Sequence, residues 1–164
     1  MKMCFKIFFI TFIVSQFLIN STSINIPVYS NTQKGNCLIR WNVNNESDSM
    51  YVQCGGFNRF SGTYEADPYN NWVIYPVVRA LDNKLYPNIS IVLNNGNWRS
   101  SIWIGTENNE PGDAFEIIFI AIISNDTTTI NRYNRIQKSE GRENLGTNLE
   151  PNVFVLKAIN VFCR

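Results

Sequence analysis

Residues 72–123, WVIYPVVRALDNKLYPNISIVLNNGNWRSSIWIGTENNEPGDAFEIIFIAII, consist of short apolar runs separated by breaks that are rich in asparagine and glycine. Apolar runs of this length between turn residues are typical of β-strands. The break at 94–97 is NNGN, and an Asn-Gly pair between two alternating segments strongly indicates a β-hairpin. The last run, 115–123, is almost continuously apolar, as expected of a central strand buried on both faces. The segment therefore predicts the middle of an antiparallel β-sandwich.

Two alternating segments precede this region, at 37–43 and 50–54. Each places its apolar side chains and its cysteine on one face, because successive strand residues point to opposite sides. Turn-forming residues lie between the two segments, so we predict that they form a hairpin. The polar stretch that follows, 55–68, is interpreted as a loop.

The remaining elements complete the predicted sandwich. Strands are expected at 72–79, 89–93, 98–104, 115–123 and 153–162, and a short helix is expected from about Thr127 to Gln137. Pro76 predicts an edge position or a bend for its strand. In the strand at 98–104, alternation predicts that Trp98 lies in the core and that Trp103 lies on the outer face. The fold class is thus all-β, with about seven strands and one short helix before the last strand.

The N-terminus has the pattern of a signal peptide. Lys2 and Lys6 introduce an apolar run that ends near Ser21-Thr22-Ser23, a small-residue cleavage site. The run is shorter than the roughly 20 residues of a comfortable membrane span, and no apolar segment of spanning length follows. We predict a signal peptide at 1–23, a leader at 24–36 and one domain at 37–164, and hence a secreted protein. An uncleaved N-terminal anchor is the alternative.

Three cysteines follow the predicted signal peptide, namely Cys37, Cys54 and Cys163. In an oxidising compartment two of them should pair. A bridge between Cys37 and Cys54 fits the predicted hairpin, because both lie on its apolar face far from the turn. Cys163 would then be free, or would join two chains as a disulfide-linked homodimer. The alternative pairing joins Cys163 to one of the other two.

Three glycosylation sequons begin at Asn45, Asn88 and Asn125. Asn45 lies in the clearest predicted turn and is the site most expected to carry a glycan. The alternative is that some sequons arise by chance, since asparagine is abundant in this chain.

Charge and composition exclude several classes of function. Cleavage would remove Lys2 and Lys6, which lowers the 14 basic residues to 12 against 13 acidic ones. A near-neutral surface argues against nucleic acid and against electrostatic docking on anionic membrane. The chain has no histidine, which excludes Ser-His-Asp and Cys-His catalysis and removes the commonest zinc ligand. We expect no enzymatic activity, no cofactor and no metal.

Two charged groups have simple interpretations. Four acidic residues could offer oxygen ligands to Ca²⁺, but their spacing fits no EF-hand, and an ordinary solvated turn is the simpler reading. These residues are Glu107, Glu110, Asp113 and Glu116. Four basic residues are interpreted as a solvated face of the short helix. These are Arg132, Arg135, Lys138 and Arg142.

Aromatic residues at outward positions are the better functional clue. We place Trp103, Tyr51 and Tyr75 on outer strand faces, where they could stack on a sugar ring or fill a pocket of a partner. The alternative is that they pack in a second buried layer.

The order of motifs from residue 72 resembles a known kind of module. WVIYPVVR at 72–79 is followed by LYP at 85–87, NGNW at 95–98, IWIG at 102–105 and GDAFEI at 112–117. This order is similar to Ig-like β-sandwich modules of secreted and cell-surface proteins, mainly bacterial, over roughly residues 37–162. The resemblance implies an Ig-like fold with an extracellular binding or spacer role and no defined active site. The three cysteines depart from the family pattern.

We therefore expect a secreted, glycosylated, non-enzymatic domain that binds an unknown extracellular protein or glycan, or that takes part in a surface assembly. A carbohydrate-binding module that uses exposed aromatic side chains is the first alternative. A small secreted hydrolase and a secreted inhibitor or effector are the others, because one fold serves many functions.

Overall fold

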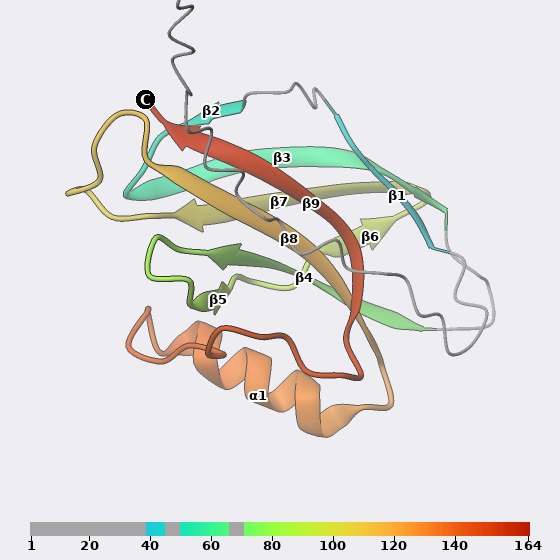
Figure 1. The fold of residues 1–164 in the computed structure, drawn as a ribbon. Helices are drawn as coiled ribbons and strands as arrows, with labels where there is room; N and C mark the ends of the chain where they lie inside the picture. The colour runs from blue at the N-terminus through green and yellow to red at the C-terminus, as the bar shows by residue number, and fades with distance from the viewer. Residues whose placement is uncertain (1–38, 45–49, 66–70) are drawn as a thin grey trace, which may run out of the picture. The chain divides into compact units, whose positions relative to one another are not determined.

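Residues 39–44, 50–65 and 71–164 are described by the structure, a computed structural model. Within these ranges the chain forms nine β-strands and one α-helix, and the strands make two sheets (Figure 1). This arrangement confirms the predicted all-β sandwich with one short helix before the last strand. The predicted signal peptide at 1–23 and the leader at 24–36 lie outside the described residues.

The first sheet has four strands in the order β1-β3-β7-β6. They are β1 (Arg40–Val43), β3 (Gly56–Glu65), β7 (Asn97–Ile104) and β6 (Val92–Asn94). The second sheet has five strands in the order β2-β9-β8-β4-β5. They are β2 (Met50–Val52), β9 (Phe154–Cys163), β8 (Ala114–Ile123), β4 (Trp72–Arg79) and β5 (Leu85–Pro87). Neighbouring strands are antiparallel except β2 and β9, which are parallel.

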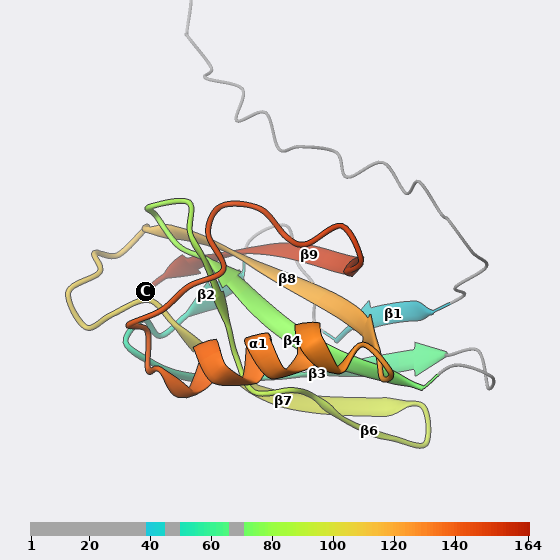
Figure 2. The same ribbon diagram turned by 90° about the horizontal axis from the view of Figure 1, so that it is seen from below.

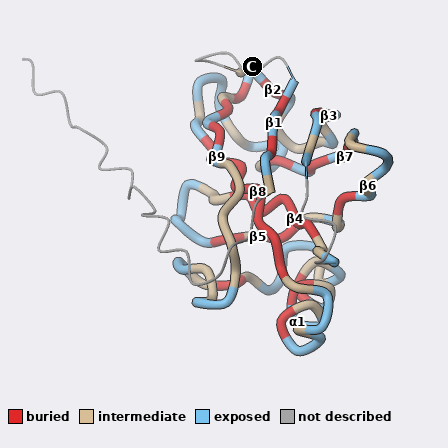
Figure 3. The backbone as a smooth tube through the Cα atoms, turned by 90° about the vertical axis from the view of Figure 1, so that its right-hand side faces the viewer, coloured by how far each residue is buried: buried red, intermediate tan, exposed pale blue. Residues whose placement is uncertain are grey.

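Strand β8 separates two apolar cores. Ile117, Phe119 and Ala121 point to the core shared with the four-stranded sheet. The alternate residues Ile118, Ile120 and Ile122 point to a second core under the helix α1 (Thr127–Lys138). Figure 2 shows α1 crossing the sheet at β4 and β8, and Figure 3 shows the buried stretches of these strands. The predicted burial of residues 115–123 on both faces is confirmed, because one face meets a sheet and the other a helix.

The core between the sheets is built on aromatic rings. Trp41 of β1 stacks on Trp98 of β7 with ring centroids 4.6 Å apart, and Phe119 packs against Trp98 at 5.2 Å. The Trp98 Nε1 donates a hydrogen bond to the Asn42 carbonyl at 3.0 Å, which satisfies its one buried donor. The prediction that Trp98 is the core tryptophan is confirmed.

Residues 56–65 form β3, although the sequence predicted a loop there. Glycine and polar residues hide the alternation, in which Phe60 and Gly62 point inward. Gly62 is glycine for a steric reason: a Cβ there would lie 1.9 Å from the Asn42 carbonyl oxygen and 2.6 Å from Trp98 Nε1. A strand that needs glycine at such a close approach carries a weak apolar signal. Both β3 and the short β5 are additions to the predicted strands.

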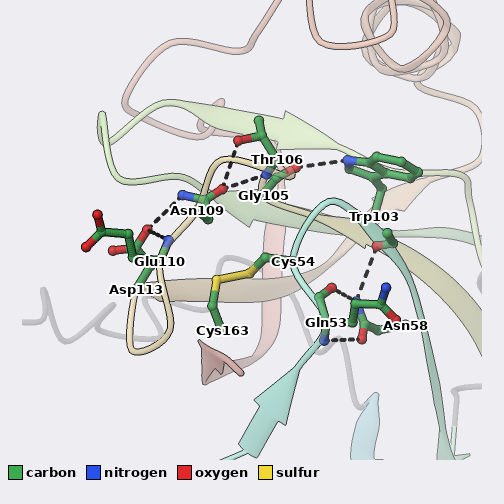
Figure 4. The surroundings of a disulfide bond; sticks show 11 residues. Gln53, Cys54, Asn58, Trp103, Gly105, Thr106, Asn109, Glu110, Asp113 and Cys163 are labelled. Carbon is green, nitrogen blue, oxygen red and sulfur yellow. Dashed lines mark hydrogen bonds between the residues drawn. A yellow bond between two sulfur atoms is a disulfide. The ribbon is translucent and has the colours of Figure 1, made fainter.

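The predicted hairpin between residues 37–43 and 50–54 is wrong. β1 pairs with β3, whereas β2 pairs with β9 in the other sheet. Cys54 is therefore bonded to Cys163, with Cα atoms 5.4 Å apart, and not to Cys37 (Figure 4). The bond leaves no thiol at Cys163 for the disulfide-linked homodimer that the sequence suggested. Cys37 lies outside the described residues.

Pro76 lies inside the sheet and not in an edge strand, because β4 is flanked by β8 and β5. Its carbonyl accepts a hydrogen bond from the Asn88 backbone N–H at 2.8 Å, on the side that faces β5. On this side β5 pairs only with Val77, Val78 and Arg79. The N–H group that proline lacks would therefore point to a place where β4 and β5 form no backbone ladder. The predicted edge position of Pro76 is wrong.

The helix α1 begins after Asp126 and packs on the five-stranded sheet through Tyr133 and Ile136. The Thr129 backbone N–H donates to Asp126 Oδ1 at 3.1 Å, and this bond lowers the pKa of the Asp126 carboxyl below its ordinary value. The hydroxyl of Tyr133 donates to Glu150 at 2.8 Å, which ties the loop before β9 to the helix. No helix in the described ranges has the length and apolar character that a membrane span requires.

Candidate functional site

A cleft of ≈ 850 Å³ opens beside the start of β3, the end of β7, β5 and the C-terminal end of α1. This volume is in the range of small-molecule and cofactor sites. Six large apolar side chains are exposed in the described part of the chain, and four of them line the cleft. The four are Phe57, Leu81, Ile89 and Trp103. Exposed apolar groups that gather in a hollow mark a binding site, whereas scattered ones do not.

The centre of the exposed apolar surface is an aromatic pair. Phe57 and Trp103 are opposite each other in the register of β3 and β7, and their rings are 5.0 Å apart at an interplanar angle of 85°. The Trp103 Nε1 donates a hydrogen bond to the Gly105 carbonyl at 2.9 Å (Figure 4). With 45% of its surface exposed, Trp103 presents a ring whose orientation is already fixed.

Asn88 holds the backbone of Trp103 as a neighbouring strand would. The Trp103 N–H donates to Asn88 Oδ1 at 2.7 Å, and Asn88 Nδ2 donates to the Trp103 carbonyl at 3.4 Å. The edge of β7 is open here, because β6 pairs only with Asn97, Trp98 and Arg99. The Asn88 side chain therefore supplies both the donor and the acceptor that a strand would supply.

The loop between β7 and β8 forms a fixed wall of the cleft. Asn109 Oδ1 accepts hydrogen bonds from the Thr106 N–H at 2.6 Å and from Thr106 Oγ1 at 3.2 Å (Figure 4). Asn109 Nδ2 donates to Asp113 Oδ2 at 2.9 Å. The Cys163 N–H donates to the Asp113 carbonyl at 2.9 Å, so this loop is tied to the strand end that carries the Cys54–Cys163 disulfide.

The charged groups of the cleft lie on the side of α1 and β5. Asp82 pairs with Lys84 at 3.2 Å, and Glu143 pairs with Arg135 at 3.3 Å. The Lys84 backbone N–H lowers the pKa of Asp82, and burial raises the pKa of Tyr86. Both shifts move the titration away from neutral pH, so neither group is tuned for proton transfer near pH 7.

The three predicted contact aromatics lie in different places. Trp103 is on the outer face of β7, as predicted. Tyr51 is also exposed, but it lies on β2 of the other sheet, beside Phe162. The outward position of Tyr75 is wrong, because α1 covers that face of β4: Tyr75 is 1% exposed, and its hydroxyl donates to Asn134 at 2.9 Å. Burial raises the pKa of Tyr75.

Two of the four acidic residues considered as calcium ligands, Asp113 and Glu116, have other side-chain partners. Asp113 accepts hydrogen bonds from Asn109 and from the Glu110 N–H, and Glu116 pairs with Arg79 at 2.8 Å. Across residues 39–44, 50–65 and 71–164, no group of three or more His, Cys, Asp or Glu side chains is placed to hold a metal ion.

Three of the four basic residues assigned to the helix face lie on α1, whereas Arg142 follows the end of α1. Arg132 pairs with Glu150 at 2.6 Å, and Arg135 pairs with Glu143. These pairs fit the interpretation of this helix face as a solvated surface.

The sequons have different surroundings. Asn125 is exposed in the turn between β8 and α1, where its side chain is available for a glycan. The Asn88 amide is hydrogen-bonded to the Trp103 backbone and lines the cleft. Asn45 lies outside the described residues.

Sequence reasoning missed Phe57 and the role of Asn88. Phe57 was assigned to a loop, and only the weak alternation of Asn58, Phe60 and Tyr64 could have revealed the strand. Asn88 was considered only as a sequon, and its contact with Trp103 joins residues 15 positions apart. Comparison with models of known protein families and with curated proteins finds no match for this chain.

Proposed function

We propose that the chain is a secreted, glycosylated recognition module that binds an extracellular ligand in the cleft around Phe57 and Trp103 and does no chemistry. The observation that carries this proposal is the fixed, half-exposed indole of Trp103. A ring that is already oriented loses little entropy when a ligand stacks on it. The resemblance to Ig-like extracellular modules supports the location outside the cell.

A carbohydrate is the ligand class that the cleft favours. Aromatic rings stack on the apolar C–H face of a sugar, and Phe57 and Trp103 offer such rings beside the hydrogen-bonding groups of Thr106 and Gln137. A protein partner is the second candidate. It is favoured by Leu81 and Ile89, which could receive an apolar anchor residue in the same cleft.

Replacing Trp103 with alanine is expected to abolish retention on immobilised polysaccharides or to weaken it about 30-fold, which corresponds to roughly 2 kcal/mol for a central aromatic contact. Because the side chain is half exposed, the free energy of unfolding should fall by only about 1 kcal/mol or less. Binding is measured as retention on a panel of immobilised polysaccharides, and stability is measured by urea denaturation.

Tyr51→Ala is the matched control, because Tyr51 is an exposed aromatic outside the cleft. It should leave binding unchanged. Equal losses for the two variants would contradict the placement of the site at Trp103. If no polysaccharide binds the parent protein, the carbohydrate ligand is rejected and the protein partner becomes the first candidate.

The protein secreted from a eukaryotic host should begin near Ile24, carry N-glycans at Asn45 and Asn125 and have an unmodified Asn88. A glycan at Asn88 would occupy the cleft and disturb the hydrogen bonds to Trp103. We therefore expect the folded, secreted protein to carry no glycan at Asn88. Intact mass before and after deglycosylation, with peptide mapping of all three sequons, measures these features. Retention in the cell with residues 1–23 uncleaved would contradict secretion, and a fully occupied Asn88 would contradict a ligand site in the cleft.

A further inference from the structure

Two arginines stand beside the aromatic pair on the outer face of the four-stranded sheet. In the register of β3 and β7, Arg59 is opposite Ser101 and Arg99 is opposite Ser61. These positions continue the outward row that begins with Phe57 and Trp103. From Trp103 to Arg99 the row spans four residue-to-residue steps along β7, or roughly 14 Å at about 3.4 Å per step. An oligosaccharide of a few sugars has this reach.

Neither of these arginines has an ion-pair partner within residues 39–44, 50–65 and 71–164. The other arginines of the sheets differ in this respect: Arg40 pairs with Glu65 at 3.4 Å and Arg79 with Glu116. Diagonal neighbours on adjacent strands are about 7–8 Å apart, and like charges at such positions repel. An anionic group between Arg59 and Arg99 would remove this repulsion.

The surface between the arginines is suited to an anion. Arg59, Ser61, Arg99 and Ser101 line a second hollow of ≈ 530 Å³. The hydroxyl groups of Ser61 and Ser101 can donate hydrogen bonds, and none of the described residues that line this hollow is acidic. Guanidinium groups bind carboxylate and sulfate oxygens through paired hydrogen bonds.

We propose that the ligand is an acidic glycan, with a sugar ring on Phe57 and Trp103 and with its carboxylate or sulfate group between Arg59 and Arg99. This inference rests on the proposed function, because it names the ligand class of the same recognition surface. The positions of the acidic and basic side chains determine which end of the glycan lies at which end of the surface. Its anionic end lies over the outer face of the sheet, away from Asp82 and the other acidic groups at the α1 side of the cleft.

The test compares the parent protein with the double variant Arg59→Gln/Arg99→Gln on four immobilised polymers: heparin, polygalacturonate, dextran and polyglutamate. Polygalacturonate carries carboxylates alone, whereas heparin carries both carboxylates and sulfates, so binding of heparin without binding of polygalacturonate would assign sulfate as the recognised group. The double variant should bind the preferred acidic glycan at least tenfold more weakly, and its affinity should depend less on salt concentration. Trp103→Ala should weaken the same interaction.

Lys138→Gln/Arg164→Gln is the matched control, since it removes two positive charges from exposed residues that line neither hollow. It should keep the affinity of the parent protein. Equal weakening by the two double variants would overturn the site, because net charge alone would then explain binding. Retention on polyglutamate as strong as on the acidic glycans, unaffected by Trp103→Ala, would also overturn it.

The two proposals fail in different ways. Binding of dextran that requires Trp103 but is unaffected by Arg59→Gln/Arg99→Gln, with no preference for the acidic polymers, would overturn the acidic ligand and leave the proposed recognition function in place. An absence of binding to every polysaccharide, with each variant folded by circular dichroism, would overturn both the carbohydrate ligand and this inference.

Discussion

The double variant Cys54→Ala/Cys163→Ala should lose about 4–5 kcal/mol of unfolding free energy, because the disulfide closes a loop with a sequence separation of 109 residues. In the unfolded chain such a bond removes many conformations, and the entropic benefit grows with loop length. Alanine is the suitable replacement at Cys163, because this position is 1% exposed and a serine there would bury its hydroxyl group.

The bond also holds an edge of the five-stranded sheet. β2 has three residues and pairs with β9 through Met50, Tyr51 and Val52. Without the disulfide, these few contacts alone would keep β2 in place, so its backbone amides should exchange hydrogen much faster. Urea denaturation measures the stability change, and hydrogen exchange locates it.

Reduction of the parent protein should reproduce most of the loss, whereas reductant should not affect the stability of the double variant. A decrease below about 1 kcal/mol in the double variant would contradict the pairing of Cys54 with Cys163. The single variants are unsuitable as controls, because each leaves one unpaired thiol.

Gly62→Ala should destabilise the protein by about 3 kcal/mol or more, at the upper end of the costs of overpacking. The new Cβ would lie 1.9 Å from the Asn42 carbonyl oxygen and 2.7 Å from Trp98 Cε2. Backbone and a buried indole cannot both move aside, since Trp98 also stacks on Trp41 and bonds to the Asn42 carbonyl. The tryptophan near-UV circular dichroism should change with the lost stability.

Gly56→Ala provides a matched control in the same strand. A Cβ at Gly56 would meet its nearest atom, in the Gln53 side chain, at 3.8 Å. This substitution should leave stability unchanged or raise it by up to about 1 kcal/mol, because alanine restricts the unfolded chain. If both variants were as stable as the parent, the alignment that places Gly62 over Trp98 would be incorrect.

Local patterns were sufficient for part of the fold. The continuous apolar run at 115–123 predicted β8, and alternation at 98–104 distinguished the buried Trp98 from the exposed Trp103. Both predictions are correct because the side of a strand to which a side chain points follows from its position in that strand alone. The helix was also recognisable, and it begins directly after its cap, Asp126.

The errors arise where distant segments decide the outcome. The partner of Cys54 depends on the pairing of β2 with β9, and these strands are more than 100 residues apart in the chain. The burial of Tyr75 depends on α1, which covers β4 from far along the chain. The cleft likewise needs β3, β5, β7 and α1 together, so the sequence could predict the exposure of Trp103 but not its surroundings.

The lengths of the strands limit pairing between copies of the chain. In the described ranges the strands at the sheet edges, β1, β6, β2 and β5, have four, three, three and three residues. The interior strands have eight or ten. A long open edge offers unpaired backbone groups to a second copy and so starts aggregation. Because these edge strands are short, they offer few unpaired backbone groups with which a second copy of the chain could extend either sheet.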